Sequence, residues 1–149
     1  MNAKDIMIRQ AHTIPVQCTI GEALRQMADL RIQAFPIVDE KKMVVGTLSF
    51  WQILEWAMPS YISQDDLSDV RFAPDLAQFH ERLGELKPKP VTQVMNPQPP
   101  CVRPDDSVLA CAVLIMKTPK TVYLLPVVET DQQLVGVISA WDIIKEITG

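Results

Sequence analysis

The sequence is poor in the residues on which catalysis and metal binding most often depend. It has only two histidines and three cysteines among 149 residues. His12 and His80 do not stand in an H-E-x-x-H pattern, and no G-x-S-x-G or phosphate-loop pattern occurs. We therefore expect that the protein is not an enzyme and that it has neither a catalytic cofactor nor a metal site.

The cysteines, Cys18, Cys101 and Cys111, are odd in number and form no C-x-x-C pair. Reduced thiols in a cytoplasmic protein are the simplest interpretation, and a redox switch at Cys18 or Cys101 is the alternative. The first residues lack a basic segment followed by a long apolar run, so we expect no secretory signal.

Strong charge and long apolar runs are also missing. Fourteen basic and eighteen acidic side chains give a net charge of -4, whereas a nucleic-acid surface usually shows a basic excess. No apolar run approaches the ~20 residues of a membrane helix. We expect neither nucleic acid nor membrane as a partner. Because 48% of the residues are hydrophobic, the chain can build the core of one compact domain or two small ones.

The most informative feature of the sequence is a segment that occurs twice. Residues 35–54 read FPIVDEKKMVVGTLSFWQIL, and residues 125–144 read LPVVETDQQLVGVISAWDII. Four pairs of distinctive residues share a single offset of ninety residues, without a gap. The pairs are Pro36 and Pro126, Gly46 and Gly136, Ser49 and Ser139, and Trp51 and Trp141. Such an internal repeat determines how the rest of the chain is interpreted.

The first half of each copy predicts a short strand and then a helix. In the first copy, residues 19–22 have capping-box form, and apolar residues at helical spacing follow as far as about Leu30. In the second copy, the helix starts at Asp106 or Ser107 and is apolar without a break over residues 108–116. A helix that is apolar on every side needs cover all round. This helix therefore implies a partner, most simply a second copy of the chain.

The second half of each copy predicts a hairpin and a closing helix. Strands are expected over residues 34–38 and 44–48, joined by a short charged turn. Ser49 and Gln52 then form a second capping box, which begins a helix over residues 50–57. The three tryptophans of the closing helices either join an interface or pack in the core; they are Trp51, Trp56 and Trp141.

Residues 59–90 separate the copies and are too many for a plain loop. We expect an amphipathic helix here, capped by Asp75 and ended by a K-P-K-P segment. This helix packs on the body of the protein or, alternatively, docks a partner. Its apolar side would consist of Leu76, Phe79, Leu83 and Leu86.

These features resemble a tandem pair of cystathionine-beta-synthase-type (CBS) domains, a Bateman module. The marks are the openings D-I-M and Q-V-M, the proline strand, the glycine strand and the closing Ser-x-x-Asp/Gln. The resemblance implies an α/β fold (α+β by some schemes) of two β-α-β-β-α motifs. The motifs would pack through their sheets with pseudo-twofold symmetry, helices outside, and pairs often dimerise. It divides the chain into CBS motif 1 (1–58), a connector (59–90) and CBS motif 2 (91–149).

The usual ligands of this family are adenosyl compounds: AMP, ADP, ATP and S-adenosylmethionine. The resemblance implies that Ser139 meets phosphate and that Asp142 holds the ribose hydroxyls. A helix start does suit phosphate, through free amides and the dipole, although both residues can equally serve only as a helix cap. The remaining residues implied at this site are Thr121, Val122, Tyr123, Leu124, Cys101 and Val102.

The first copy departs from this pattern because Gln52 stands where the second copy has Asp142. We expect this cleft either to be empty or to form a weaker second site, made of Ser49, Gln52, Ile32 and Ala34. Gln33 and Tyr123 stand where several relatives place a phosphate-binding Arg or His. The candidates to supply positive charge instead are Arg9, Arg31, Arg103, Lys117 and Lys120.

The sequence thus predicts a regulatory sensor that binds an adenosyl ligand and acts on a partner protein. The alternative is a dimeric scaffold whose clefts are vestigial and bind nothing. The particular ligand and the client protein stay open.

Overall fold

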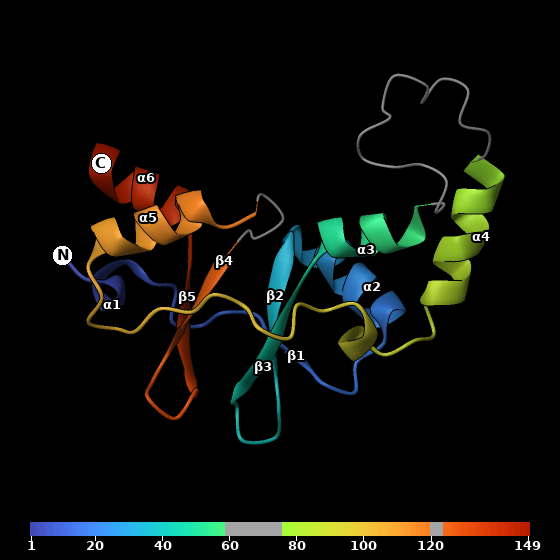
Figure 1. The fold of residues 1–149 in the computed structure, drawn as a ribbon, viewed down its shortest axis with the longest axis horizontal. Helices are drawn as coiled ribbons and strands as arrows, with labels where there is room; N and C mark the ends of the chain where they lie inside the picture. Colours follow the sequence, from blue (N-terminus) through green and yellow to red (C-terminus); the bar gives the residue numbers. More distant parts are fainter. Residues whose placement is uncertain (59–75, 120–123) are drawn as a thin grey trace.

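The structure is a computed structural model that describes residues 1–58, 76–119 and 124–149. Two units of strands and helices lie next to each other, with their hairpins side by side between them and the helices above and to either side of the hairpins (Figure 1). The predicted mixed α/β organisation in two repeats is confirmed. The first repeat contains α1 (Ala3–Ile6), β1 (Ile14–Pro15), α2 (Ile20–Leu30), β2 (Ala34–Val38), β3 (Val44–Ser49) and α3 (Phe50–Ala57).

The second repeat contains α5 (Val108–Lys117), β4 (Leu124–Val128), β5 (Leu134–Ser139) and α6 (Ala140–Thr148). Before it come α4 (Leu76–Leu86) and a short 3-10 turn, η2 (Val91–Gln93).

Local sequence explains the helix ends. The Thr19 hydroxyl accepts the amide of Glu22 at 3.2 Å, and α2 ends at Arg31, which has a left-handed φ of 55°.

The two hairpins have equivalent registers. Ala34 pairs with Ser49 in the first, and Leu124 pairs with Ser139 in the second. β1 adds a parallel strand to the first sheet, whereas only Val102 forms the corresponding parallel bridge in the second repeat. The hairpin tips also meet through an antiparallel bridge between Met43 and Gln133. The sheets of the two repeats therefore contact each other at their hairpin tips, and an approximate twofold axis relates them.

Each repeat is preceded by an opening segment, and each opening segment packs on the other repeat instead of on its own. Ile8 and Val137 exchange two backbone hydrogen bonds, of 2.9 and 3.1 Å, and Thr47 and Asn96 exchange two of 3.1 and 2.8 Å. Met7, near the start of the chain, packs in the core of the second repeat. Each repeat thus completes its core with residues that precede the other repeat's first strand.

The outer helices leave apolar surface exposed. On α5, Cys111 is buried, but Leu109 and Met116 are 74% and 84% exposed. The predicted connector helix is present as α4, with Leu86 buried and Leu76 exposed; its proposed cap, Asp75, lies outside the described residues. No helix in the described ranges is long and apolar enough to cross a bilayer.

Helix α4 packs on α3. The Arg82 guanidinium donates hydrogen bonds to the backbone oxygens of Ala57 and Trp56, at 3.1 and 3.2 Å. The ammonium of Lys89 lies over the indole ring of Trp56, 4.8 Å from its centroid. These contacts hold the connector helix against the first repeat.

Candidate functional site

A cavity of about 690 Å³ lies between the two repeats. The second repeat contributes Ser139, Trp141 and Asp142, at the point where β5 passes into α6. The first repeat contributes residues 31–34, from the end of α2 into β2, and part of the opening segment, including His12. The opening segment, including His12, reaches the second repeat because Ile8 is paired with β5.

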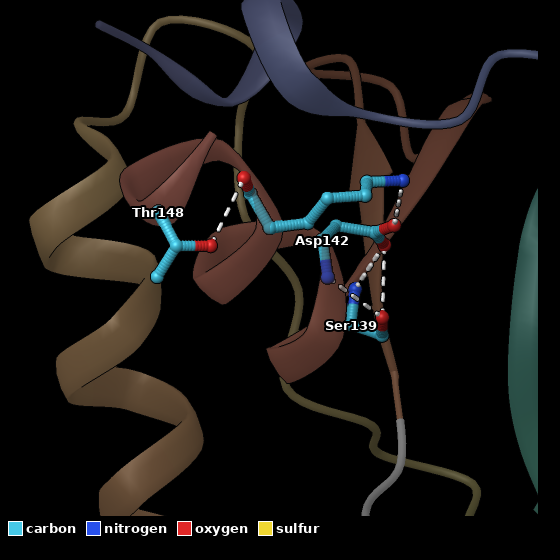
Figure 2. Close-up of polar contacts among 4 residues, drawn as sticks. Ser139, Asp142 and Thr148 are labelled. Carbon is cyan, nitrogen blue, oxygen red and sulfur yellow. Dashed lines mark hydrogen bonds and ion pairs between the residues drawn. The ribbon is translucent and has the colours of Figure 1, made fainter.

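Ser139 and Asp142 form a reciprocal cap at the start of α6 (Figure 2). Asp142 Oδ2 accepts from the Ser139 amide at 2.8 Å and from the Ser139 hydroxyl at 2.9 Å. The Asp142 amide donates to Ser139 Oγ at 3.3 Å. The capping role expected as an alternative is therefore present, and both residues also line the cavity. The cap engages Ser139 Oγ and one carboxylate oxygen of Asp142, Oδ2.

The second carboxylate oxygen of Asp142 is less engaged. Oδ1 lies 3.9 Å from Lys145 Nζ, one helical turn further along α6 (Figure 2). Asp142 is only 4% exposed, so its charge is screened by protein groups more than by water. The positive end of the α6 dipole and the Lys145 ammonium therefore both lie beside this carboxylate.

The other residues predicted for this site are placed differently. Leu124 lines the cavity with Ser139 and Asp142, whereas residues 121–123 (Thr121, Val122 and Tyr123) lie outside the described residues. Cys101 and Val102 are not among the described residues that line it. Val102 is buried in the second core, and its amide donates to the Pro126 carbonyl at 3.0 Å. The opening segment of the first repeat takes the place that these two residues were expected to fill.

A smaller cavity of about 290 Å³ contains the first-repeat counterparts. Ser49, Gln52 and Ala34 line it, together with Asn96 and Thr118 from the chain around the second repeat. Ile32, predicted for this site, instead lines the larger cavity. No charged side chain is found among its described lining residues. Ala34 and Leu124 line both cavities, so the two cavities share a wall.

Ser49 differs from Ser139 in its hydrogen bonding. Gln52 Oε1 accepts the Ser49 amide at 2.7 Å, which reproduces one half of the cap. Ser49, however, is only 3% exposed, and its buried hydroxyl has no hydrogen-bond partner within the described part of the chain. The first repeat thus leaves a buried polar atom at the edge of its cavity.

Sequence reasoning missed the contribution of Gln10, Ala11 and His12 to the larger cavity. Their local pattern contains no ligand signature, and the backbone pairing of Ile8 with Val137 is what carries them there. Among the candidates for positive charge, Arg31 lines the larger cavity. Lys120 lies outside the described residues.

The cysteines are poorly suited to redox switching. Burial raises the pKa of Cys18 to about 11, with a smaller contribution from its hydrogen bond with Glu22. Burial also raises the pKa of Cys101, although the charge of Arg103 opposes the shift. Both side chains are therefore neutral thiols near pH 7, and the reactive thiolate is disfavoured.

Comparisons with known proteins agree with the repeat. A family model described as the CBS domain matches residues 3–59 and 91–149. The CBS domain-containing protein CBSX2 of Arabidopsis thaliana, a chloroplastic protein, is 25% identical over 141 residues, 90% of this chain. Those residues cover 57% of CBSX2, so the chain spans little more than half the length of that relative.

Solved structures show the same fold. The crystal structure of CBSX2 gives a TM-score of 0.78 at 19% identity and covers 99% of this chain and 94% of that chain. Its complex with AMP gives 0.73 at 19% identity, covering 99% and 96%. The CBS domain pair of protein MJ0100, in complex with 5'-methylthioadenosine and S-adenosylmethionine, gives 0.71 at 21% identity, covering 100% and 97%. From its repeat, its fold and these matches, the chain belongs to the CBS domain family and carries two copies of the domain.

Proposed function

We propose that the chain is a regulatory module that binds an adenosyl ligand in the larger cavity and acts on a partner protein. The observation that carries the proposal is the opening of the Ser139–Asp142 cap onto a cavity of about 690 Å³. This volume lies within the ~300–1,000 Å³ of small-molecule sites. The complexes of CBSX2 with AMP and of MJ0100 with two adenosyl compounds support an adenosyl ligand here.

The chemistry of the cap suits the two polar parts of such a ligand. Oδ1 of Asp142 accepts no hydrogen bond within the described residues, so it can take a ribose hydroxyl without breaking the cap. The Ser139 hydroxyl and the first-turn amides of α6 stand at the positive end of a helix dipole, which stabilises a phosphate. Apolar lining such as Ile32 and Leu124 provides contact area for the base.

Regulation follows from the origin of the cavity walls. Ser139 belongs to the second repeat and Arg31 to the first, so a ligand contacts both repeats at once. Binding shifts a conformational equilibrium only by the difference in affinity between its states. We infer that an adenosyl ligand favours the arrangement in which the two repeats close on it. A cytoplasmic location stays a prediction, since the CBSX2 relative is chloroplastic.

The exposed face of α5 and α6 favours self-association, which is also the basis of the alternative scaffold function. Trp141 and Ile147 on α6 are 65% and 74% exposed, and Leu109 on the contacting helix α5 is 74% exposed. We propose that this face forms a homodimer interface. Light scattering after chromatography is expected to give a dimer for the wild type and a monomer for Ile147→Glu. A monomeric wild type at micromolar concentration would exclude this interface.

Thermal unfolding with AMP, ATP or S-adenosylmethionine tests the ligand proposal. A ligand at a hundred times its dissociation constant adds about 2.7 kcal/mol to the free energy of unfolding. Asp142→Ala is expected to abolish the shift, while Gln52→Ala keeps most of it. The reverse pattern would place the site in the first repeat. No shift with any adenosyl compound would favour the scaffold.

A further inference from the structure

Arg31 stands in the wall of the larger cavity, although it belongs to the repeat that lacks the Ser-x-x-Asp pattern. Its place is set by the end of α2. The amides of Arg31 and Ile32 both point to the carbonyl of Met27, and Arg31 takes a left-handed φ of 55°. This compact helix end turns the chain toward β2 and leaves Arg31 at the cavity.

The guanidinium of Arg31 is uncompensated in the described part of the chain. No hydrogen bond or ion pair of its side chain is found there, and the same is true of the His12 imidazole in the same wall. Asp142, the one carboxylate among the described lining residues, already accepts hydrogen bonds from Ser139 through Oδ2, and its Oδ1 lies 3.9 Å from Lys145 Nζ. The lining therefore presents a positive charge, at Arg31, that no described residue pairs with.

We propose that Arg31 binds the phosphate of the adenosyl ligand, so that the larger cavity prefers a nucleoside monophosphate over adenosine and over S-adenosylmethionine. The inference rests on the proposed function of the same cavity and goes further, because it names the ligand class and the residue that selects it. The His12 imidazole adds a second polar group to the wall. A phosphate would then connect Arg31 of one repeat with the α6 terminus of the other.

The charges of the candidate ligands decide the preference. A phosphate gains charge-assisted hydrogen bonds from a guanidinium, which can contact two of its oxygens at once. S-adenosylmethionine carries a sulfonium and an ammonium against one carboxylate, so its net charge has the sign of Arg31. Adenosine has no group for Arg31 to bind. The smaller cavity lacks a charged side chain among its described lining residues and cannot offer this interaction.

The test is calorimetric titration of the full chain with AMP, adenosine and S-adenosylmethionine. The wild type is expected to bind AMP at least roughly tenfold more tightly than adenosine, the effect of one charged hydrogen bond. Arg31→Gln is expected to remove roughly that factor for AMP and to leave adenosine within about twofold. Arg31→Lys, which keeps the charge but not the planar fork, is expected to fall between them.

Arg25→Gln is the matched control, because Arg25 is an exposed arginine on the same helix and does not line the cavity. The Arg25→Gln variant loses one positive charge, as Arg31→Gln does, and is expected to change the affinity for neither AMP nor adenosine. Thermal unfolding without ligand checks that each variant is folded. The inference is overturned if the wild type binds AMP and adenosine equally, or if Arg31→Gln weakens both alike. If no adenosyl compound binds the wild type, the proposed function itself fails.

Discussion

Gly136 is the position at which the exchange of opening segments can be tested most sharply. A Cβ atom there would lie 2.7 Å from Met7 Sδ and 3.0 Å from the backbone oxygen of Ile8. Real Cβ contacts almost never fall below 3.0 Å, so the Met7 side chain has to move, and the opening segment, whose Ile8 oxygen is at 3.0 Å, has to give by a few tenths of an ångström. The two hydrogen bonds between Ile8 and Val137 restrain it. Gly136→Ala is therefore expected to destabilise the protein through the contact between repeats.

The size of the effect follows from these contacts. Overpacking a tight site costs about 1–3 kcal/mol, and weakening two backbone hydrogen bonds adds roughly 1 kcal/mol. We expect a loss of about 2–4 kcal/mol in the free energy of unfolding. Since about 1 kcal/mol shifts the midpoint by ~2–4 °C in a chain of this length, the melting temperature is expected to fall by roughly 5–15 °C.

The assay is thermal and urea unfolding followed by circular dichroism. Gly84→Ala is the control, because a Cβ at this position of α4 has nothing within 4 Å. There alanine is expected to stabilise the helix by about 0.5–1 kcal/mol. Removing the Met7 side chain as well is expected to reduce the penalty at Gly136, which a double-mutant cycle detects. A Gly136→Ala variant as stable as the wild type would refute the exchanged packing.

Two further predictions concern single side chains. Ser139→Ala is expected to lower the free energy of unfolding by about 1 kcal/mol, because it removes a cap; Ser49→Ala is expected to cost nothing or to stabilise, since its hydroxyl is buried without a partner in the described residues. Equal losses in urea unfolding would contradict this difference. Burial, and to a smaller extent a hydrogen bond with Glu22, raises the pKa of the Cys18 thiol from 9.0 to about 11. The contribution of this thiol to the free energy of unfolding is therefore complete below pH 9.0 and is lost as the pH rises through about 11. A thiol reagent at pH 8 is expected to label Cys18 only after unfolding, and rapid labelling of the folded protein would argue against the buried thiol.

Much of the fold could be predicted because its signals are local. The capping box at Thr19 and the apolar spacing behind it predicted α2 to its last residue, Leu30. The pair of Ser49 and Gln52 predicted the start of α3 in the same way. Because the sequence repeats, each element predicted in the first half was also predicted in the second half. Leu124, predicted for the same site as Ser139 and Asp142, does line the same cavity.

The rest depended on contacts between distant segments, which no local pattern encodes. Nothing near Ile8 indicates that it pairs with Val137 instead of with its own repeat. Cys101 and Val102, which were predicted to flank the ligand, are not among the described residues that line the larger cavity, whereas the opening segment of the first repeat does line it. Arg31 was one of several candidate cations, and only the tertiary structure places it in the cavity.

A crystal structure of the protein grown with saturating AMP tests the central claim most directly. We expect one nucleotide in the larger cavity, with ribose hydroxyls at Asp142 and phosphate within hydrogen-bond distance of Ser139 or Arg31. A nucleotide bound only beside Ser49, or a larger cavity filled by the protein's own side chains in the presence of AMP, would contradict it.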